Sequence, residues 1–84
     1  MRWENKMSKD LFDLVAGIVN VSPQELTLES GPENLPKWDS LAQITIVSAI
    51  EQKYSIKLTM PEILSIRSVA NLQELIEKHG GITN

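Results

Sequence analysis

Apolar residues recur along this chain at helical spacing, and no segment alternates strongly enough at period two to compete as a β-strand. In the first apolar segment the spacing is i, i+3, i+4, i+7 and i+8, which is the pattern of a buried helical stripe. Ser8 is predicted to cap this helix, and Asp10 in its first turn suits the helix dipole. The stripe consists of Leu11, Leu14, Val15, Ile18 and Val19.

From about residue 20 to residue 39 the periodicity disappears, and a long loop is predicted because Pro23, Gly31, Pro32 and Pro36 accumulate there. Loops of this length are usually functional or disordered. Four apolar residues spaced through it favour an ordered loop that packs over the helices. These anchors are Val21, Leu26, Leu28 and Leu35. The segment 22–25 resembles a capping box, which predicts a short helical turn.

A second helix is predicted from Ser40 to about Tyr54, and its helical wheel carries two apolar arcs. The wider arc has the width of a core face. It consists of Ile46, Val47, Ile50 and Tyr54. Leu41 and Ile44 fall outside it, on the side of Ser40, Ser48 and Glu51. They either pack under the loop or form an apolar face on which a partner docks.

Two further helices are predicted after residue 57. Thr59, followed by Pro61 and Glu62, predicts a capped helix of little more than one turn. Ser68 is predicted to cap a final helix, and Gly80 to end it at the C′ position. The inward positions of that helix are Val69, Leu72, Leu75 and Ile76. The fold class is therefore all-α: a small four-helix bundle of three longer helices and one short helix, with a long loop between the first two.

The chain has 84 residues, which predicts a single domain over 1–84 with flexible ends at 1–7 and 81–84. A domain of this size buries only about 60% of the surface of its unfolded chain, which argues against a large internal active site. Cysteine is absent, which removes disulfides, thiolate metal sites and a cysteine nucleophile. With no membrane-length apolar run and no signal-peptide pattern, a monomer in the cytoplasm is expected, with no membrane insertion and no metal site.

Charge excludes a further class of function. The net charge is −3, and no stripe of Lys and Arg exists that could release phosphate counterions, so a nucleic acid is not an expected partner. The distribution is uneven: residues 1–39 carry seven acids and four bases, whereas residues 40–57 carry one acid and two bases. The predicted second helix is therefore almost uncharged.

The dipeptide Asp39-Ser40 places a hydroxyl, with an acid beside it, at the start of the second helix. In most proteins such a pair only caps a helix. A helix N-terminus also suits a phosphate ester, because its first N–H groups lack intrahelical acceptors and the macrodipole favours negative charge. A serine hydrolase is excluded, since the chain has no G-x-S-x-G motif and its single histidine, His79, is predicted to be a dipole partner at the end of the last helix.

These features together resemble the acyl carrier protein family, over about residues 8–79. The resemblance rests on the order of the helices and on the segments 38–41, 49–51 and 68–69. It implies a helical bundle without catalytic activity that carries acyl groups on a covalent 4′-phosphopantetheine arm. Ser40 matches the serine of the family that bears the arm, and Asp39 matches the acid before it. The implied partners are a phosphopantetheinyl transferase, whose Mg²⁺ Asp39 helps to coordinate, and enzymes that load and transfer acyl groups.

The chain departs from the family pattern in its second helix, where Glu51 is the only acid. The resemblance implies fatty-acid or polyketide biosynthesis. Many acyl carrier proteins have an acidic second helix that meets basic patches on their enzymes, so its absence here argues against the general carrier of fatty-acid synthesis. Here the departure favours a carrier dedicated to a specialised pathway, with weaker electrostatic steering. The predicted partner-binding residues are Trp38, Leu41, Ile44, Ser48 and Glu51. Trp38 has a second interpretation, in which it closes the loop onto the bundle.

The cargo stays open at this point. The Trp-Asp-Ser-Leu pattern also occurs in D-alanyl carrier proteins and other stand-alone carriers, so an aminoacyl or peptidyl cargo is an alternative. A second alternative is an unmodified helical adaptor that binds a partner through Leu41 and Ile44. Several residues either line an acyl cavity or simply pack in the core. These are Ile46, Val47, Ile50, Tyr54 and Ile63.

Overall fold

The predicted helical fold class is confirmed by a computed structural model that describes the backbone of residues 2–80 and the side chains from residue 9 onward. Within this range the structure contains helices and loops and no strand. The helices are α1 (Arg2–Val19), α2 (Ser40–Tyr54), α3 (Met60–Leu64) and α4 (Val69–Lys78), and the single 3-10 turn η1 (Pro23–Glu25) interrupts the long loop. No helix of residues 2–80 combines the length and the apolar character that a membrane span requires.

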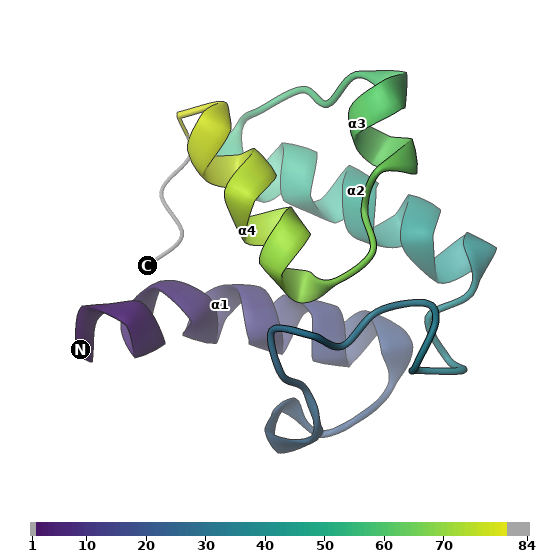
Figure 1. Ribbon diagram of the computed structural model, residues 1–84. Coiled ribbons are helices and arrows are strands. Elements are labelled where there is room, and N and C mark those ends of the chain that lie inside the picture. The colour runs from purple at the N-terminus through teal and green to yellow at the C-terminus, as the bar shows by residue number, and fades with distance from the viewer. Residues whose placement is uncertain (1, 81–84) are drawn as a thin grey trace.

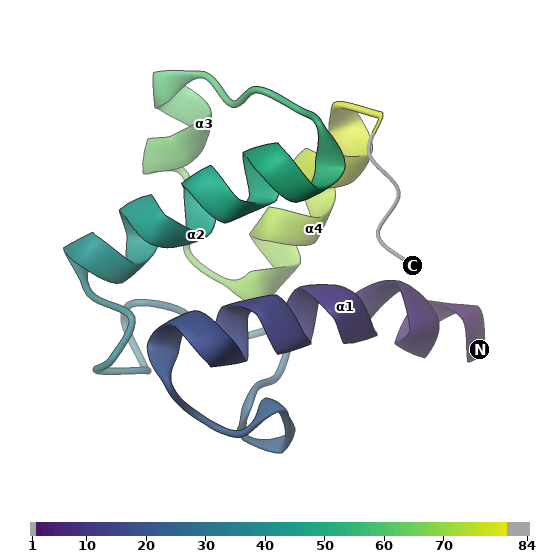
Figure 2. The same cartoon turned by 180° about the vertical axis from the view of Figure 1, so that it is seen from behind.

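The helices form a bundle in which α2 runs back antiparallel to α1 (Figure 1). Helix α4 packs with both, and the short α3 lies on the side of α2 and α4 that faces away from α1, as the view from behind also shows (Figure 2). The long loop crosses the end of the bundle between α1 and the start of α2. Helix α3 therefore lies at the outside of the bundle.

Helix α1 begins at Arg2, six residues before Ser8, so the prediction that Ser8 caps it is wrong. The physical reason is that residues 2–7 contain neither Gly nor Pro and are mostly good helix formers, so nothing in the sequence stops the helix from extending. The flexible ends predicted at 1–7 and 81–84 stay a prediction. Residues 1 and 81–84 lie outside the described part of the chain.

The core joins the predicted apolar stripes of the three longer helices. Leu11, Val15 and Val19 of α1 are buried, and Leu14 and Ile18 pack against the core from its edge. The loop contributes Trp38, which is one of the largest fully buried side chains. Helices α2 and α4 supply Ala42, Ile46, Val47, Ile50, Val69, Leu72 and Ile76. Burial of these side chains, at about 1.5–3 kcal/mol for each large aliphatic one, holds the bundle together.

The loop is ordered, as predicted, but its attachment uses backbone as well as side chains. Leu26 is buried, and Val21 and Leu35 pack against the core. Leu28 is 45% exposed, so its side chain is not the anchor that was predicted. Leu28 is attached through its backbone carbonyl instead. Ala70 N–H donates to Leu28 O, and Val69 N–H donates to Ser30 O, each at 2.9 Å. Two loop carbonyls thus satisfy the first amides of α4, which otherwise lack intrahelical partners.

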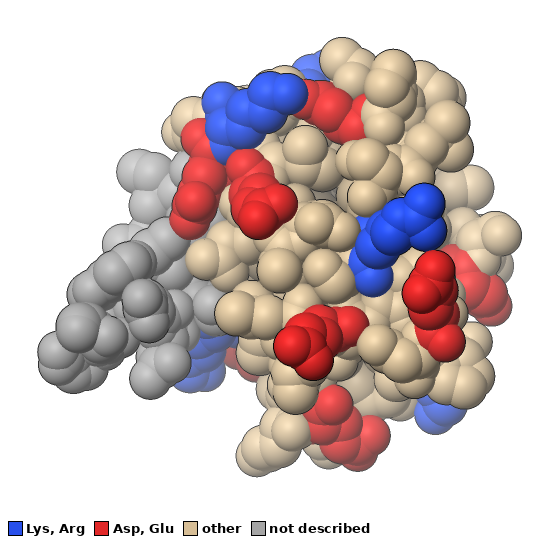
Figure 3. All heavy atoms as spheres, viewed as in Figure 1, with Lys and Arg blue, Asp and Glu red and all other residues tan. Residues whose placement is uncertain are grey.

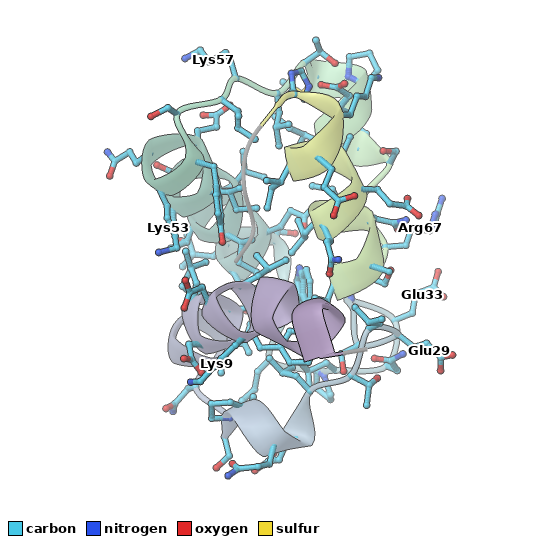
Figure 4. The ribbon with its side chains drawn as sticks, turned by 90° about the vertical axis from the view of Figure 1, so that its left-hand side faces the viewer. Lys9, Glu29, Glu33, Lys53, Lys57 and Arg67 are labelled. Atoms are coloured by element: carbon cyan, nitrogen blue, oxygen red, sulfur yellow. The ribbon has the colours of Figure 1, made fainter. Side chains whose placement is uncertain are left out.

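Gly31 allows this close approach. A Cβ at Gly31 would lie 1.9 Å from the Arg67 carbonyl oxygen, so no other residue fits here without moving backbone. Beside this contact, Arg67 and Glu33 point toward one another from the two segments (Figure 4), with their Nη1 and Oε2 atoms 3.4 Å apart. Both side chains are exposed, so the ion pair adds little to stability. The backbone contact is what fixes the loop.

The remaining helix ends follow the predicted caps, with one exception. Thr59 and Glu62 form a capping box at α3, and the Ser68 side chain accepts from Asn71 N–H at the start of α4. Gly80 follows α4 in the left-handed region, at φ 84°, as the C′ position requires. At η1 the predicted turn is confirmed, but the Ser22 side chain makes no capping hydrogen bond.

Candidate functional site

Ser40 is the first residue of α2, and its side chain is exposed. Asp39 is the N-cap residue, and its Oδ1 accepts from the Ala42 backbone N–H at 2.9 Å. The acid therefore uses one oxygen to start the helix, as the N-cap preference for Asp predicts. The Ser40 hydroxyl stands next to it, at the positive end of the α2 dipole.

A groove opens directly beside Ser40, with a volume of about 820 Å³. It lies between α2 and α3 and ends against the long loop. Its lining is mostly apolar, and the only charged side chain in it is Asp39, at the end next to Ser40. The lining residues are Pro32, Trp38, Asp39, Ser40, Gln43, Ile44, Val47, Met60, Ile63 and Leu64. A hydroxyl and an apolar groove thus share one end of the bundle.

Trp38 and Gln43 connect the floor of this groove to its far wall. The Trp38 indole N–H donates to Gln43 Oε1 at 2.7 Å, and Gln43 Nε2 donates to the Ile63 carbonyl oxygen at 3.1 Å. Trp38 itself is only 1% exposed. Its burial supports the loop-closing interpretation of Trp38, because so little of the indole reaches the surface.

Leu41 and Ile44 are 73% and 65% exposed, so the interpretation in which they pack under the loop is wrong. Ser48, one turn further along, is exposed as well. Across the groove, Met60 and Leu64 of α3 are also exposed. The surface over the outer side of α3, at upper right in Figure 3, is mostly tan, with few charged side chains. The α2–α3 side of the molecule therefore presents apolar side chains around Ser40.

Glu51 and three of the five possible cavity residues do not line the groove. Glu51 is half-buried, and its Oε2 accepts from the Leu58 N–H at 2.9 Å, so its carboxylate supports the α2–α3 connection. Of the possible cavity residues, Val47 and Ile63 line the groove. Ile46 and Ile50 pack in the core, and Tyr54 packs against it from the edge. Ile46, Ile50 and Tyr54 therefore do not line the groove.

One cluster was missed by the sequence analysis. The Glu62 carboxylate of α3 accepts from Thr59 N–H at 2.9 Å and pairs with Lys78 and His79 at the end of α4, at 3.0 and 2.9 Å. These contacts, the Thr59 hydrogen bond first among them, lower the pKa of Glu62 to about 2. The capping-box spacing pointed to Thr59, but no local signal reveals a partner on another helix. His79 was predicted only as a dipole partner for its own helix.

Among the described side chains of residues 9–80, no cluster of three His, Cys, Asp or Glu residues could hold a metal ion. What the site offers is one exposed hydroxyl at a helix N-terminus beside an apolar groove. This combination fits a covalent phosphate ester that carries an apolar group, because the helix end favours the phosphate and the groove excludes water from the apolar part.

Comparisons with known proteins agree with this geometry. A family model described as "Phosphopantetheine attachment site" matches residues 9–76. Among solved structures, the holo acyl carrier protein of Geobacter metallireducens is 24% identical with a TM-score of 0.74, over 84% of this chain and 82% of that one. The apo doublet acyl carrier protein from prodigiosin biosynthesis is 17% identical with a TM-score of 0.82, over 100% of this chain and 40% of that one. No curated protein matches significantly.

The family match covers most of the chain, so the protein belongs to the phosphopantetheine-attachment family. Its cofactor is covalently attached 4′-phosphopantetheine. Members of this family interact with phosphopantetheinyl transferases and pathway enzymes and are themselves carriers. The likeness to the two solved structures extends this agreement to the fold.

Proposed function

We propose that Ser40 bears the 4′-phosphopantetheine arm and that the chain carries acyl groups on it for a dedicated pathway, without catalytic activity of its own. The observation that carries the proposal is the exposed Ser40 hydroxyl, which stands at the N-terminus of α2 and at one end of the apolar groove. A phosphodiester at this position accepts hydrogen bonds from the first amides of α2 and lies at the positive end of its dipole.

The modification is a phosphoryl transfer from coenzyme A. The Ser40 oxygen forms a bond to the phosphorus next to the pantetheine moiety, the pyrophosphate bond breaks, and adenosine 3′,5′-bisphosphate leaves. The hydroxyl proton passes to a base of the transferase, because no histidine or second carboxylate joins Asp39 in the groove lining. Asp39 keeps one oxygen on Ala42 N–H, and its other oxygen is available to the Mg²⁺ that the transferase brings. When attached, the arm supplies a thiol that carries the cargo as a thioester.

The docking surface proposed for partner enzymes consists of Leu41, Ile44 and Ser48 of α2, with Trp38 beneath it and Glu51 at its far end. The first two side chains are apolar and largely exposed, and residues 40–50 include no charged residue. A partner that buries this surface gains from apolar contact more than from charge pairing. This supports enzymes of a specialised pathway over enzymes that recognise an acidic helix. A cytoplasmic location is part of the proposal, since the chain has none of the cysteines that stabilise many small exported domains.

The lining of the groove favours an acyl cargo over an aminoacyl cargo. An ammonium group in an apolar groove needs a carboxylate partner. The only carboxylate in the lining is Asp39, which lies at the end next to Ser40, whereas the cargo is carried at the far end of the arm. An uncharged acyl chain needs no such partner. The groove therefore supports fatty-acid-like or polyketide-like cargo over D-alanine.

Intact mass tests the attachment site. Co-expression with a promiscuous phosphopantetheinyl transferase is expected to add the mass of one arm to the wild-type chain and nothing to Ser40→Ala. Ser22→Ala, which removes an exposed hydroxyl that makes no capping hydrogen bond and lies outside the docking surface, is the matched control and is expected to be modified like wild type. A wild-type chain that stays unmodified would favour the adaptor hypothesis. An arm on Ser40→Ala would place the attachment at another residue.

A further inference from the structure

Helix α3 forms one wall of the groove, yet it has no buried residue. Its five residues give it little more than one turn, and Ile63 is its main contact with the core, from the edge. Met60 and Leu64 are exposed on the groove side. Apolar burial, which fixes the other helices, therefore contributes little to the position of α3.

Polar contacts at two points hold α3 in position. On the α4 side, the Glu62 carboxylate pairs with Lys78 and His79. On the α2 side, Gln43 Nε2 donates to the Ile63 carbonyl oxygen at 3.1 Å. Gln43 is itself fixed, because its Oε1 accepts the Trp38 indole N–H at 2.7 Å and Trp38 is buried. The Gln43 side chain thus links the buried Trp38 to the backbone of α3.

We propose that Gln43 is a positioning residue that sets the width of the groove between α2 and α3, and thereby the size of the acyl cargo that the groove accepts. The first half of this inference concerns the unmodified chain, and the second half rests on the proposed function. The hydrogen bond from Gln43 to the Ile63 carbonyl joins the α2 and α3 walls of the groove, and the bond from Trp38 holds Gln43 in place for it. A cargo that enters the groove from the Ser40 end meets this bridge and must either stop there or break it.

Two substitutions separate the two hydrogen bonds. Gln43→Met keeps the length of the side chain and removes both bonds. Gln43→Glu keeps an acceptor for the Trp38 indole but has no N–H to donate to Ile63 O. Gln52→Met is the matched control, because Gln52 is exposed on the same helix and does not line the groove. Met is a good helix former, so none of the changes weakens α2 by propensity.

Amide hydrogen exchange of the unmodified chain tests the position of α3. The reporters are Ser65 N–H, which donates to Pro61 O and Glu62 O, and Ile66 N–H, which donates to Ile63 O. Both are expected to exchange about tenfold faster in Gln43→Met and Gln43→Glu, while the amides of α4 stay protected and show that the fold is intact. Gln52→Met should match wild type. Unchanged exchange at Ser65 and Ile66 would overturn the inference.

Cargo size is tested with a transferase that installs acetyl, hexanoyl or dodecanoyl arms from the matching acyl-coenzyme A, in a Trp3→Phe background. The emission of Trp38, relative to the holo form of the same variant, reports occupancy of the groove. Wild type is expected to show no further shift from hexanoyl to dodecanoyl, whereas Gln43→Glu shows one. Equal emission shifts in wild type and Gln43→Glu would overturn the inference that Gln43 limits the size of the cargo. If no arm is added, the proposed function fails, and hydrogen exchange alone decides the role of Gln43.

Discussion

Among the glycines that the structure describes, Gly31 has the least space around it. Its backbone lies against the Arg67–Ser68 segment, so closely that a Cβ would fall 1.9 Å from a carbonyl oxygen. The requirement is for space, because Gly31 does not have the positive φ that Gly80 has. Glycine is needed here because the loop must approach the start of α4 closely enough for its carbonyls to bond Val69 and Ala70.

Gly31→Ala is expected to lower the free energy of unfolding by about 2–3 kcal/mol, because the clash is with backbone that cannot turn aside. Gly17→Ala is the matched control: nothing lies within 4 Å of a Cβ at Gly17, which is in the last turn of α1. That substitution should raise the stability by about 0.5–1 kcal/mol through helix propensity. Urea unfolding of the three chains measures both changes. A stable Gly31→Ala would mean that the loop does not lie against Arg67.

Glu62 makes the stability depend on acidic pH. Its pKa is lowered from 4.5 to about 2, first by the Thr59 N–H and then by Lys78 and His79. Because the folded state holds the carboxylate more strongly than the unfolded state does, the stabilisation is complete above pH 4.5 and is lost as the pH falls toward 2.

Unfolding of wild type and Glu62→Gln between neutral and acidic pH tests this dependence. The glutamine keeps an acceptor for Thr59 N–H but has no charge. Wild type should be the more stable chain near pH 7, and the difference should vanish toward pH 2. A difference that does not change with pH would show that the charge of Glu62 is not what stabilises α3.

At the level of the helix, α2 separates two apolar roles along one segment. Ile46 and Ile50 are fully buried against the bundle, while Leu41 and Ile44 are mostly exposed. A soluble helix with apolar residues on two sides loses the clear amphipathic pattern that α1 and α4 have. Apolar side chains that stay exposed in this way are typical of surfaces that bind a partner.

Leu41→Asp is therefore expected to change the free energy of unfolding by less than about 0.5 kcal/mol while greatly reducing modification by the transferase. Ile46→Ala, on the buried side of the same helix, should cost about 2–5 kcal/mol. Thermal or urea unfolding measures the stability of both variants. The effect of Leu41→Asp on modification is measured as the initial rate of arm transfer, at a temperature where wild type and Leu41→Asp are folded. If Leu41→Asp unfolds the chain, Leu41 belongs to the core.

The helices and their caps were predictable because their causes are local. The periodic stripes fixed α1, α2 and α4, and the side chains of Asp39, Thr59 and Ser68 marked three helix starts. What local patterns do not contain is the long-range partner. The contact of Gly31 with Arg67 and that of Gln43 with Ile63 both join segments at least twenty residues apart. The predicted start of α1 was wrong for another reason: Ser8 is a good cap residue, but residues 2–7 also favour a helix.

For the molecule as a whole, the charge distribution predicts how it meets its enzymes. The acids are concentrated in residues 1–39, and the exposed surface of α2 around Ser40 is apolar and nearly neutral. Encounters that rely on charge steering slow steeply as salt rises, because exposed charges are screened over about 10 Å at 0.1 M salt. Apolar contacts do not weaken in this way.

The rate of arm transfer to this chain is therefore expected to fall by less than about threefold between low salt and about 0.5 M salt. The measurement is kcat/KM for a transferase over a salt series. Thr45→Glu provides the comparison, since it adds an acid at an exposed position of α2, and it should make the rate more sensitive to salt. A steep dependence in wild type would mean that the acids of the loop take part in recognition.

The two loop carbonyls that bond the first amides of α4 also bear on how the chain folds. Leu28 and Ser30 lie some forty residues from Val69 and Ala70, so α4 completes its first turn only after the loop has closed over it. The loop and the last helix are thus expected to form together, although about thirty residues separate them in the sequence. A chimera that exchanges the loop between two carriers must exchange the start of α4 with it.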